Sequence, residues 1–124
     1  MFSTESKYGD LLVLVLPARP PEIQGGDKEY APGDFLHLHC SSYDSKPAAD
    51  LNWFINDKKA DGSYIITHPI ATNKSTGLYS STSELFMTLG KIHFDDNGKL
   101  NVRCEASIGG THNITTTDSE IKQK

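Results

Sequence analysis

Alternating apolar and polar residues recur in short runs along the chain. Residues 35–40 have the sequence FLHLHC, which puts Leu36 and Leu38 on the face opposite His37 and His39. Because successive side chains of a strand point to opposite faces of a sheet, this period of two predicts strands with one buried face. Three later runs repeat the pattern and supply the rest of the predicted core: Leu51, Trp53 and Ile55; Leu85, Met87 and Leu89; Leu100, Val102, Cys104 and Ala106.

Turn-forming residues separate these runs. Asp61–Ser63 precedes a strand predicted over residues 64–70, and Asp95–Gly98, with the sequence DDNG, precedes the last run. Gly109 and Gly110 predict a hairpin into a final strand. Almost no stretch has the 3.6-residue period of a helix. About seven short strands separated by turns are typical of a β-sandwich or a small barrel, so the sequence predicts an all-β fold.

The N-terminal part of the chain differs from the rest. Residues 11–16, LLVLVL, form an apolar run six residues long that ends at Pro17. A secretory leader has an apolar core of about 7–15 residues and a membrane-spanning helix needs about 20, so the run predicts neither a signal peptide nor a membrane anchor. Residues 17–26, PARPPEIQGG, have the composition of a linker that leads into a first edge strand. One globular domain is predicted over residues 27–124.

Composition and charge narrow the classes of function. The 124 residues suit a single domain, and a hydrophobic content of 36% is enough to build a core. The formal net charge of -4 argues against a nucleic-acid binder or a polybasic membrane-surface module, because both carry basic patches. No nucleophile elbow, HExxH motif or phosphate-binding loop is present in the sequence. The sequence therefore predicts no enzyme, no catalytic residue and no cofactor.

Histidines and one pair of acidic residues are the candidate metal ligands in the sequence. His37 and His39 present two imidazoles on the outer face of one strand. A zinc site needs three or four ligands, and the sequence places no further His or Cys beside them, so a solvated strand face is favoured and no metal is predicted. Asp95 and Asp96 lie in a glycine-containing turn, which favours turn chemistry over calcium binding. The other histidines are scattered and are interpreted as polar surface: His68, His93 and His112.

Both cysteines fall on predicted inward faces. Cys40 ends one strand, Cys104 lies within another, and Trp53 is the inward residue of a strand between them in the sequence. This arrangement resembles the immunoglobulin sandwich, in which two cysteines on facing sheets form a disulfide with an indole packed across it. The resemblance implies a Cys40–Cys104 bridge. The alternative is a pair of buried free thiols, as in immunoglobulin modules of a reducing compartment.

One common feature of immunoglobulin domains is absent. Many of them have a tyrosine two residues before the second cysteine, but Val102 stands there in this chain. The predicted fold is therefore an immunoglobulin-like sandwich of the C2 or constant type, with about seven strands in a Greek key.

Two N-x-[ST] tripeptides indicate the secretory pathway. They begin at Asn73 and Asn113, in segments predicted as surface loop or strand edge, and both residues are candidate glycosylation sites. The chain shows no leader for that pathway. Two interpretations stay open: a cytosolic protein, or a segment of a longer protein that is secreted or located at the cell surface.

The resemblance extends to one family, the insect Beaten path (Beat) proteins of axon guidance. This chain is similar to three patterns of their second immunoglobulin domain. The pattern P-x-I-x-G is matched by Pro21, Ile23 and Gly25, and Y-x-x-G-D is matched by Tyr30, Gly33 and Asp34. The pattern S-x-P-A-x-x-L-x-W-x-I-N is matched by Ser45, Pro47, Ala48, Leu51, Trp53, Ile55 and Asn56. STGLYSSTSELFMTLGKIHF and KLNVRCEASI are also similar to strands of that family. The similarity covers roughly residues 17–120.

The resemblance implies a non-enzymatic recognition and adhesion module whose parent binds Sidestep-family receptors. Residues 1–16 would then be the last strand of a preceding immunoglobulin domain, and recognition would lie mainly in that domain. An apolar run left without a partner strand over residues 11–16 is expected to be mobile, to add to a sheet edge of this domain, or to drive self-association. The alternative function is a cytosolic structural module of a scaffold or filament protein.

Phe54, Arg103 and Glu105 are the candidate partner contacts. Alternation with inward neighbours points them outward on adjacent strands, and an aromatic residue beside a charged pair is typical of a contact patch. The alternative is an aromatic side chain that a neighbouring segment covers. The loop Ser41–Asp50 is predicted to be exposed and to face the preceding domain.

Overall fold

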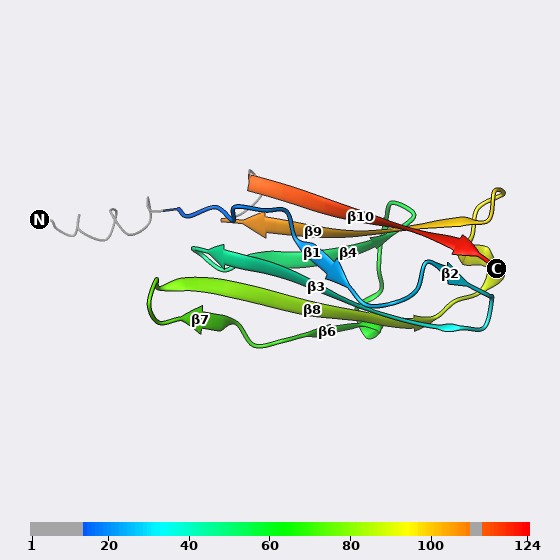
Figure 1. The fold of residues 1–124 in the computed structure, drawn as a ribbon, viewed down its shortest axis with the longest axis horizontal. Coiled ribbons are helices and arrows are strands. Elements are labelled where there is room, and N and C mark those ends of the chain that lie inside the picture. Colours follow the sequence, from blue (N-terminus) through cyan, green and yellow to red (C-terminus); the bar gives the residue numbers. More distant parts are fainter. Residues whose placement is uncertain (1–13, 110–112) are drawn as a thin grey trace, which may run out of the picture.

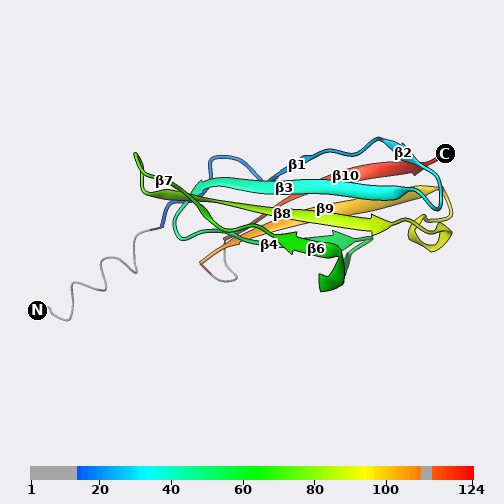
Figure 2. The same ribbon diagram turned by 90° about the horizontal axis from the view of Figure 1, so that it is seen from below.

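Two stacked β-sheets form the molecule (Figures 1 and 2), and the computed structural model describes residues 14–109 and 113–124. The first sheet has the order β1 (Glu22–Gln24), β3 (Phe35–Ser45), β8 (Leu78–Thr88), β6 (Ile65–Thr67), with β7 (Ala71–Asn73) also paired to β8. The second has the order β2 (Glu29–Tyr30), β10 (Asn113–Gln123), β9 (Lys99–Ile108), β4 (Asp50–Ile55), β5 (Lys58–Lys59).

The predicted all-β sandwich is confirmed. Within the described residues the helices are two 3₁₀ turns, η1 (Gly62–Tyr64) and η2 (Lys91–His93). Neither these turns nor any other described segment forms a helix long and apolar enough to cross a membrane. Strands outnumber the predicted seven because the structure resolves short pieces of two or three residues, such as β2 and β5, that periodicity cannot detect.

The core follows the alternation in the sequence. The predicted core residues Leu38, Trp53, Leu85, Leu100 and Val102 are all buried, with at most 2% of their surface exposed. The sixth, Leu51, is only partly buried, because it lies between the main core and a small cluster around Ala49, Ala106 and Ile108. The inward set of β9 is completely buried as predicted: Leu100, Val102, Cys104 and Ala106.

Two adjacent links join the sheets through this core. Cys40 of β3 and Cys104 of β9 form a disulfide with a Cα–Cα distance of 6.5 Å and a sequence separation of 64. Trp53 pairs with Cys104 on one sheet, and Ser83 pairs with Cys40 on the other. The indole Nε1 of Trp53 donates a hydrogen bond of 3.1 Å to Ser83 Oγ in the buried interior. The predicted bridge is present, and its long loop is worth roughly 4 kcal/mol in the chain-entropy model.

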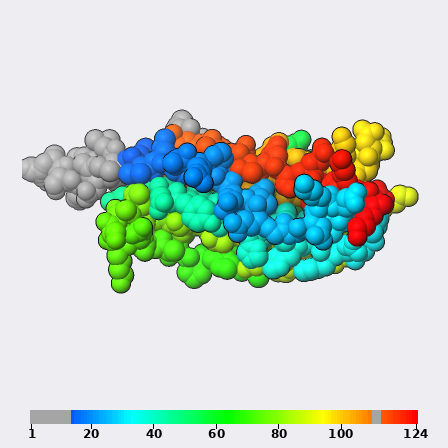
Figure 3. All heavy atoms as spheres, in the orientation of Figure 1, coloured from blue at the N-terminus to red at the C-terminus, as the bar shows by residue number. Residues whose placement is uncertain are grey.

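The first strand switches between the two sheets. β1 pairs with β3, and the following β2 runs parallel to β10 in the other sheet. Figure 3 shows the segment before them lying between β10 and β3, where Thr117 Oγ1 donates a hydrogen bond to the carbonyl of the buried Pro21. Gly26, with φ of +76°, makes the turn between β1 and β2, and a Cβ there would lie 2.7 Å from Leu38 Cδ2. The packed structure therefore includes part of the predicted linker.

The strand predicted over residues 64–70 is interrupted. β6 ends at Thr67, although His68 N still donates a hydrogen bond of 3.0 Å to the Thr82 carbonyl of β8, and the ladder resumes at Ala71, in β7. Pro69 lies in the gap. Since proline has no N–H to donate to a ladder, it breaks the run that its apolar neighbours suggest.

Ser83→Ala and Ser42→Ala form a matched test of the link between Trp53 and Ser83. Ser83→Ala leaves the buried indole N–H without an acceptor, so we expect it to lower the free energy of unfolding by about 1–3 kcal/mol. Ser42 Oγ is buried and has no hydrogen-bond partner within the described part of the chain. Ser42→Ala should therefore leave the stability unchanged or raise it. Urea unfolding followed by Trp53 fluorescence measures both, and equal losses in the two variants would contradict the assignment.

Candidate recognition surfaces

The predicted contact residues lie together on the outer face of the second sheet. Phe54 pairs with Arg103 across the ladder between β4 and β9, and Asn52 pairs with Glu105 in the same way. All four side chains are half-buried, while the β9 residues on either side of Arg103 are completely buried. The outward orientation of Phe54, Arg103 and Glu105 agrees with the sequence prediction. These four residues and Asp118 are called the Phe54–Arg103 face below.

Two carboxylates hold the guanidinium of Arg103 in place. Its Nε donates a hydrogen bond of 2.9 Å to Asp118 Oδ1 on β10, and its Nη2 lies 3.0 Å from Asp57 Oδ1. The hydrogen bond and charge of Asp118, followed by Asp57, raise the pKa of Arg103 further above its ordinary value. Exposed ion pairs add little stability. Their effect here is to fix the guanidinium over the sheet beside Phe54.

The composition of this face suits protein recognition. Aromatic residues and arginine are enriched at the centres of protein interfaces, where they supply much of the binding energy. The short strand β5 pairs with β4 at Phe54, opposite Lys59. A half-buried ring next to a tethered guanidinium presents a rigid contact that loses little conformational freedom on binding.

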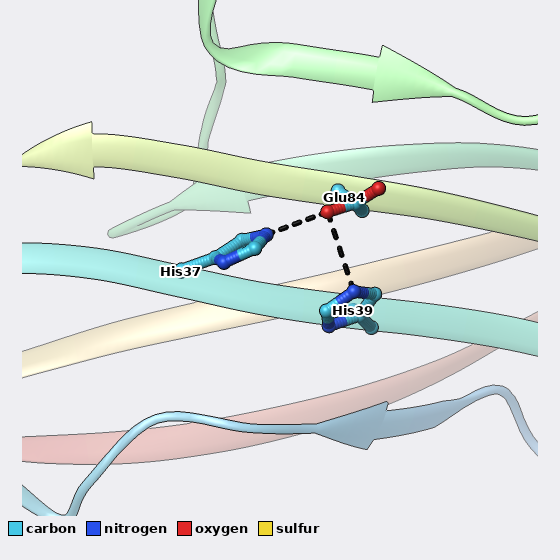
Figure 4. Close-up of side chains that lie close together, drawn as sticks. All are labelled: His37, His39 and Glu84. Carbon is cyan, nitrogen blue, oxygen red and sulfur yellow. Dashed lines mark hydrogen bonds and ion pairs between the residues drawn. The ribbon is translucent and has the colours of Figure 1, made fainter.

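The outer face of the first sheet carries a cluster that the sequence did not predict (Figure 4). His37 Nε2 lies 2.6 Å from Glu84 Oε1, and His39 Nε2 lies 3.3 Å from the same oxygen. His68 Nε2 contacts the other carboxylate oxygen of Glu84. His37, His39 and His68 do lie on the solvent-exposed face, with 40–46% of their side chains exposed, but the sequence did not predict that they gather around Glu84. The register of β3 with β8, which pairs His39 with Glu84, was the missing information.

The histidines determine the protonation behaviour of Glu84. Hydrogen bonds from His37 and from His68 lower the pKa of the Glu84 carboxyl, and the charge of His39 adds to the effect. The carboxylate is also the least exposed member, since its side chain is 16% exposed against 40–46% for the histidines. The rings of Phe86 and Phe35 each lie 6.4 Å from the His37 ring, measured between centroids. The cluster is thus a polar site beside an aromatic patch.

The segment Ser41–Asp50 is not simply the exposed loop that was predicted, because it is partly strand and partly buried. β3 continues to Ser45 and β4 begins at Asp50, so more than half of the segment is strand. Ser42, Ser45 and Ala49 are buried, although the residues between them are largely exposed. Ser81 Oγ donates a hydrogen bond of 2.7 Å to the Ala49 carbonyl and ties the segment to β8.

The chain upstream of Pro17 lies against this same segment. Val15 N donates to the Lys46 carbonyl at 3.0 Å, and Lys46 N donates back to the Val15 carbonyl at 2.9 Å. Figure 1 shows the entering segment at the end of the sandwich where β3 ends and β4 begins. Leu14 and Leu16, on either side of Val15, are 47% and 51% exposed. The rest of the apolar run 11–16 lies outside the described residues.

Both sequons lie at this end of the sandwich, at the end of β7 and the start of β10 (Figure 1). Asn73 is exposed, and its side-chain oxygen accepts a hydrogen bond of 2.9 Å from Ser75 N in the turn between β7 and β8. Asn113 is half-buried. Of the two, the exposed turn at Asn73 offers the more accessible position for a glycan.

The remaining predicted polar residues have local structural roles. Asp95 Oδ1 accepts hydrogen bonds from Asn97 N at 2.8 Å and from Lys99 N at 2.9 Å, which confirms the turn interpretation. His93 Nδ1 accepts a hydrogen bond of 2.7 Å from Gly90 N at the start of η2. His112 lies outside the described residues.

Known proteins share this sequence pattern and fold. Cell adhesion molecule 2 of Homo sapiens and of Mus musculus is 39% identical over 72 residues, which is 58% of this chain and 16% of each relative. The chain thus spans about a sixth of the length of these relatives. A crystal structure of Rst D1-D2 has a TM-score of 0.72 at 22% identity and covers 90% of this chain and 51% of that chain.

The family profile described as CD80-like C2-set immunoglobulin domain matches residues 20–120. That range includes the disulfide, Trp53 and the strands from β1 to most of β10. The predicted C2 type agrees with this match. This chain belongs to the family of CD80-like C2-set immunoglobulin domains.

Proposed function

We propose that this chain is a non-enzymatic recognition module of an adhesion protein located outside the cell or at its surface. The observation that carries the proposal is the 39% identity with cell adhesion molecule 2 over 72 residues, in a chain that belongs to the C2-set family. The disulfide supports it, because such bridges persist in oxidising compartments. The exposed sequon at Asn73 is consistent with the same compartment.

In its finer form the proposal is a second-domain module like that of the Beat family, within a protein that binds Sidestep-family receptors. The motif residues Pro47, Ala48 and Leu51 support this form. The pairing of Val15 with Lys46 also supports it, since it lays the upstream chain against the motif segment. On this proposal the segment Ser41–Asp50 is an interdomain contact, residues 1–16 close a preceding domain, and that domain leads recognition.

The Phe54–Arg103 face is proposed as the contact surface that this domain itself contributes. It combines an aromatic ring, a tethered guanidinium and the carboxylate of Glu105 on one sheet face. A cytosolic structural module of a scaffold or filament remains the second hypothesis. It requires free thiols at Cys40 and Cys104 and unmodified asparagines at both sequons.

Binding to a panel of extracellular domains, with Sidestep-type receptors first, tests the finer form. This chain and a version that carries a complete preceding immunoglobulin domain are compared by surface plasmon resonance. We expect the longer version to bind at least about tenfold more tightly, because most contacts lie upstream. Equal affinity of the two versions would contradict the upstream location of recognition, and no binding by either would contradict the finer proposal.

Phe54→Ala tests the contact surface in the version that binds. We expect it to weaken binding by about 1–3 kcal/mol if the ring lies at the centre of the interface, since aromatic anchors dominate interface energies. Phe35→Ala is the matched control, because Phe35 is 58% exposed on the outer face of the opposite sheet. An effect of Phe35→Ala equal to that of Phe54→Ala would show that the face is wrongly assigned.

Residues 11–16 are proposed to drive self-association when no partner strand covers them. The two described leucines of the run, Leu14 and Leu16, have about half of their surface exposed. We expect residues 1–124 to form dimers or larger species and residues 17–124 to be monomeric in light scattering. The same number of chains per particle for both chains at the same concentration would contradict this proposal.

A further inference from the structure

Three side chains on the outer face of the first sheet are placed to bind one metal ion (Figure 4). The ligand atoms are His37 Nε2, His39 Nε2 and a carboxylate oxygen of Glu84, and they all lie within 4.8 Å of one another. We propose that these three groups form a binding site for Zn²⁺. The proposal is independent of the recognition function, because it concerns the opposite sheet from the Phe54–Arg103 face.

The backbone of two paired strands builds the site. The period of two along β3 puts both histidines on the outer face, with ring centroids 4.9 Å apart. The antiparallel register then places Glu84 of β8 directly across from His39. Ligands carried by hydrogen-bonded strands are positioned more accurately than ligands carried by loops. The arrangement does not depend on the residues outside the described ranges.

The donor set favours zinc over the hard cations. Two imidazole nitrogens and one carboxylate oxygen are a common set of three protein ligands for Zn²⁺, whereas Ca²⁺ and Mg²⁺ prefer oxygen ligands alone. Tetrahedral Zn²⁺ with bonds of about 2.0–2.2 Å needs ligand atoms about 3.3 Å apart. His39 Nε2 already lies 3.3 Å from Glu84 Oε1, and His37 Nε2, at 2.6 Å, must move away by less than about 1 Å.

Exposure leaves room for this adjustment and for entry of the ion. The side chains of His37 and His39 are 46% and 43% exposed, so both rings can rotate. Three protein ligands leave the fourth position, on the solvent side, to water. Both cysteines of the chain are in the disulfide, so no thiolate competes for the metal.

The surroundings of Glu84 suit a metal-binding carboxylate. Its ion pairs within the described ranges are all with histidines: His37, His39 and His68. No lysine or arginine among those residues therefore neutralises it by direct contact. His68 Nε2 contacts Glu84 Oε2, the oxygen that His37 and His39 do not contact. Carboxylates that bind metals are commonly held by such a hydrogen bond. His68 is therefore assigned as a positioning residue that orients Glu84.

Isothermal titration of the oxidised chain with zinc chloride tests the proposal, on protein that carries no histidine tag. We expect one Zn²⁺ per chain and no binding of calcium chloride. His37→Gln, His39→Gln and Glu84→Gln should each lower the zinc affinity by at least about tenfold, because each removes a ligand. His93→Gln is the matched control, since His93 lies in η2, where its Nδ1 accepts a hydrogen bond from Gly90 N. It should bind zinc like the parent chain.

His68 is tested by a conservative and a disruptive variant. His68→Ala should weaken zinc binding by about 10- to 100-fold, whereas His68→Gln, whose amide can still donate to Glu84, should retain most of the affinity. Thermal unfolding without zinc checks that every variant folds. Addition of zinc should then raise the unfolding temperature of the parent chain, of His93→Gln and of His68→Gln. It should leave the unfolding temperatures of His37→Gln, His39→Gln and Glu84→Gln nearly unchanged.

Three results would overturn the proposal. The first is no zinc binding by the parent chain, and the second is binding that His39→Gln and Glu84→Gln leave unchanged. The third is an equal loss in His93→Gln. Nuclear magnetic resonance adds a direct readout, because stoichiometric zinc should shift the imidazole signals of His37 and His39 and leave the signal of His93 in place.

Discussion

The disulfide between Cys40 and Cys104 is the constraint on which the rest of the structure depends. It joins the two sheets, and the hydrogen bond from Trp53 to Ser83 joins them again through the residues that pair directly with the two cysteines. Once the sheets are fixed there, the alternation along β3, β4 and β9 determines which side chains face outward. The histidines of β3 and the arginine of β9 are surface residues because their neighbours, Cys40 and Cys104, are bridged inside.

This arrangement gives the domain two outer faces with different chemistry. The Phe54–Arg103 face has a ring and a guanidinium tethered by carboxylates, which suits contact with a protein. The opposite face concentrates imidazoles around the single carboxylate of Glu84, which suits a metal ion. One end of the sandwich carries a third set of features, because the upstream chain pairs with Lys46 at the same end as both sequons.

Sequence reasoning succeeded where one strand alone contains the information. The period of two in FLHLHC and KLNVRCEA predicted the buried residues and the outward position of Arg103, while the disulfide was implied by the resemblance to an immunoglobulin sandwich. It failed where pairing between strands decides the outcome. Glu84 and His68 meet His37 and His39 only through the register of β3, β6 and β8, which no local pattern encodes. The prediction that the segment Ser41–Asp50 is an exposed loop was wrong in part for the same reason, since pairing with β8 extends β3 beyond its apolar alternation.

The state of the two cysteines in protein made by a secretory cell tests the central claim most directly. Folded chain is alkylated without reduction, digested, and mapped by mass spectrometry. We expect a peptide pair linked through Cys40 and Cys104, with no alkylated cysteine, and a glycan on Asn73. Natively folded protein in which both cysteines are alkylated and Asn73 is unmodified would contradict an extracellular adhesion module and favour the cytosolic structural alternative.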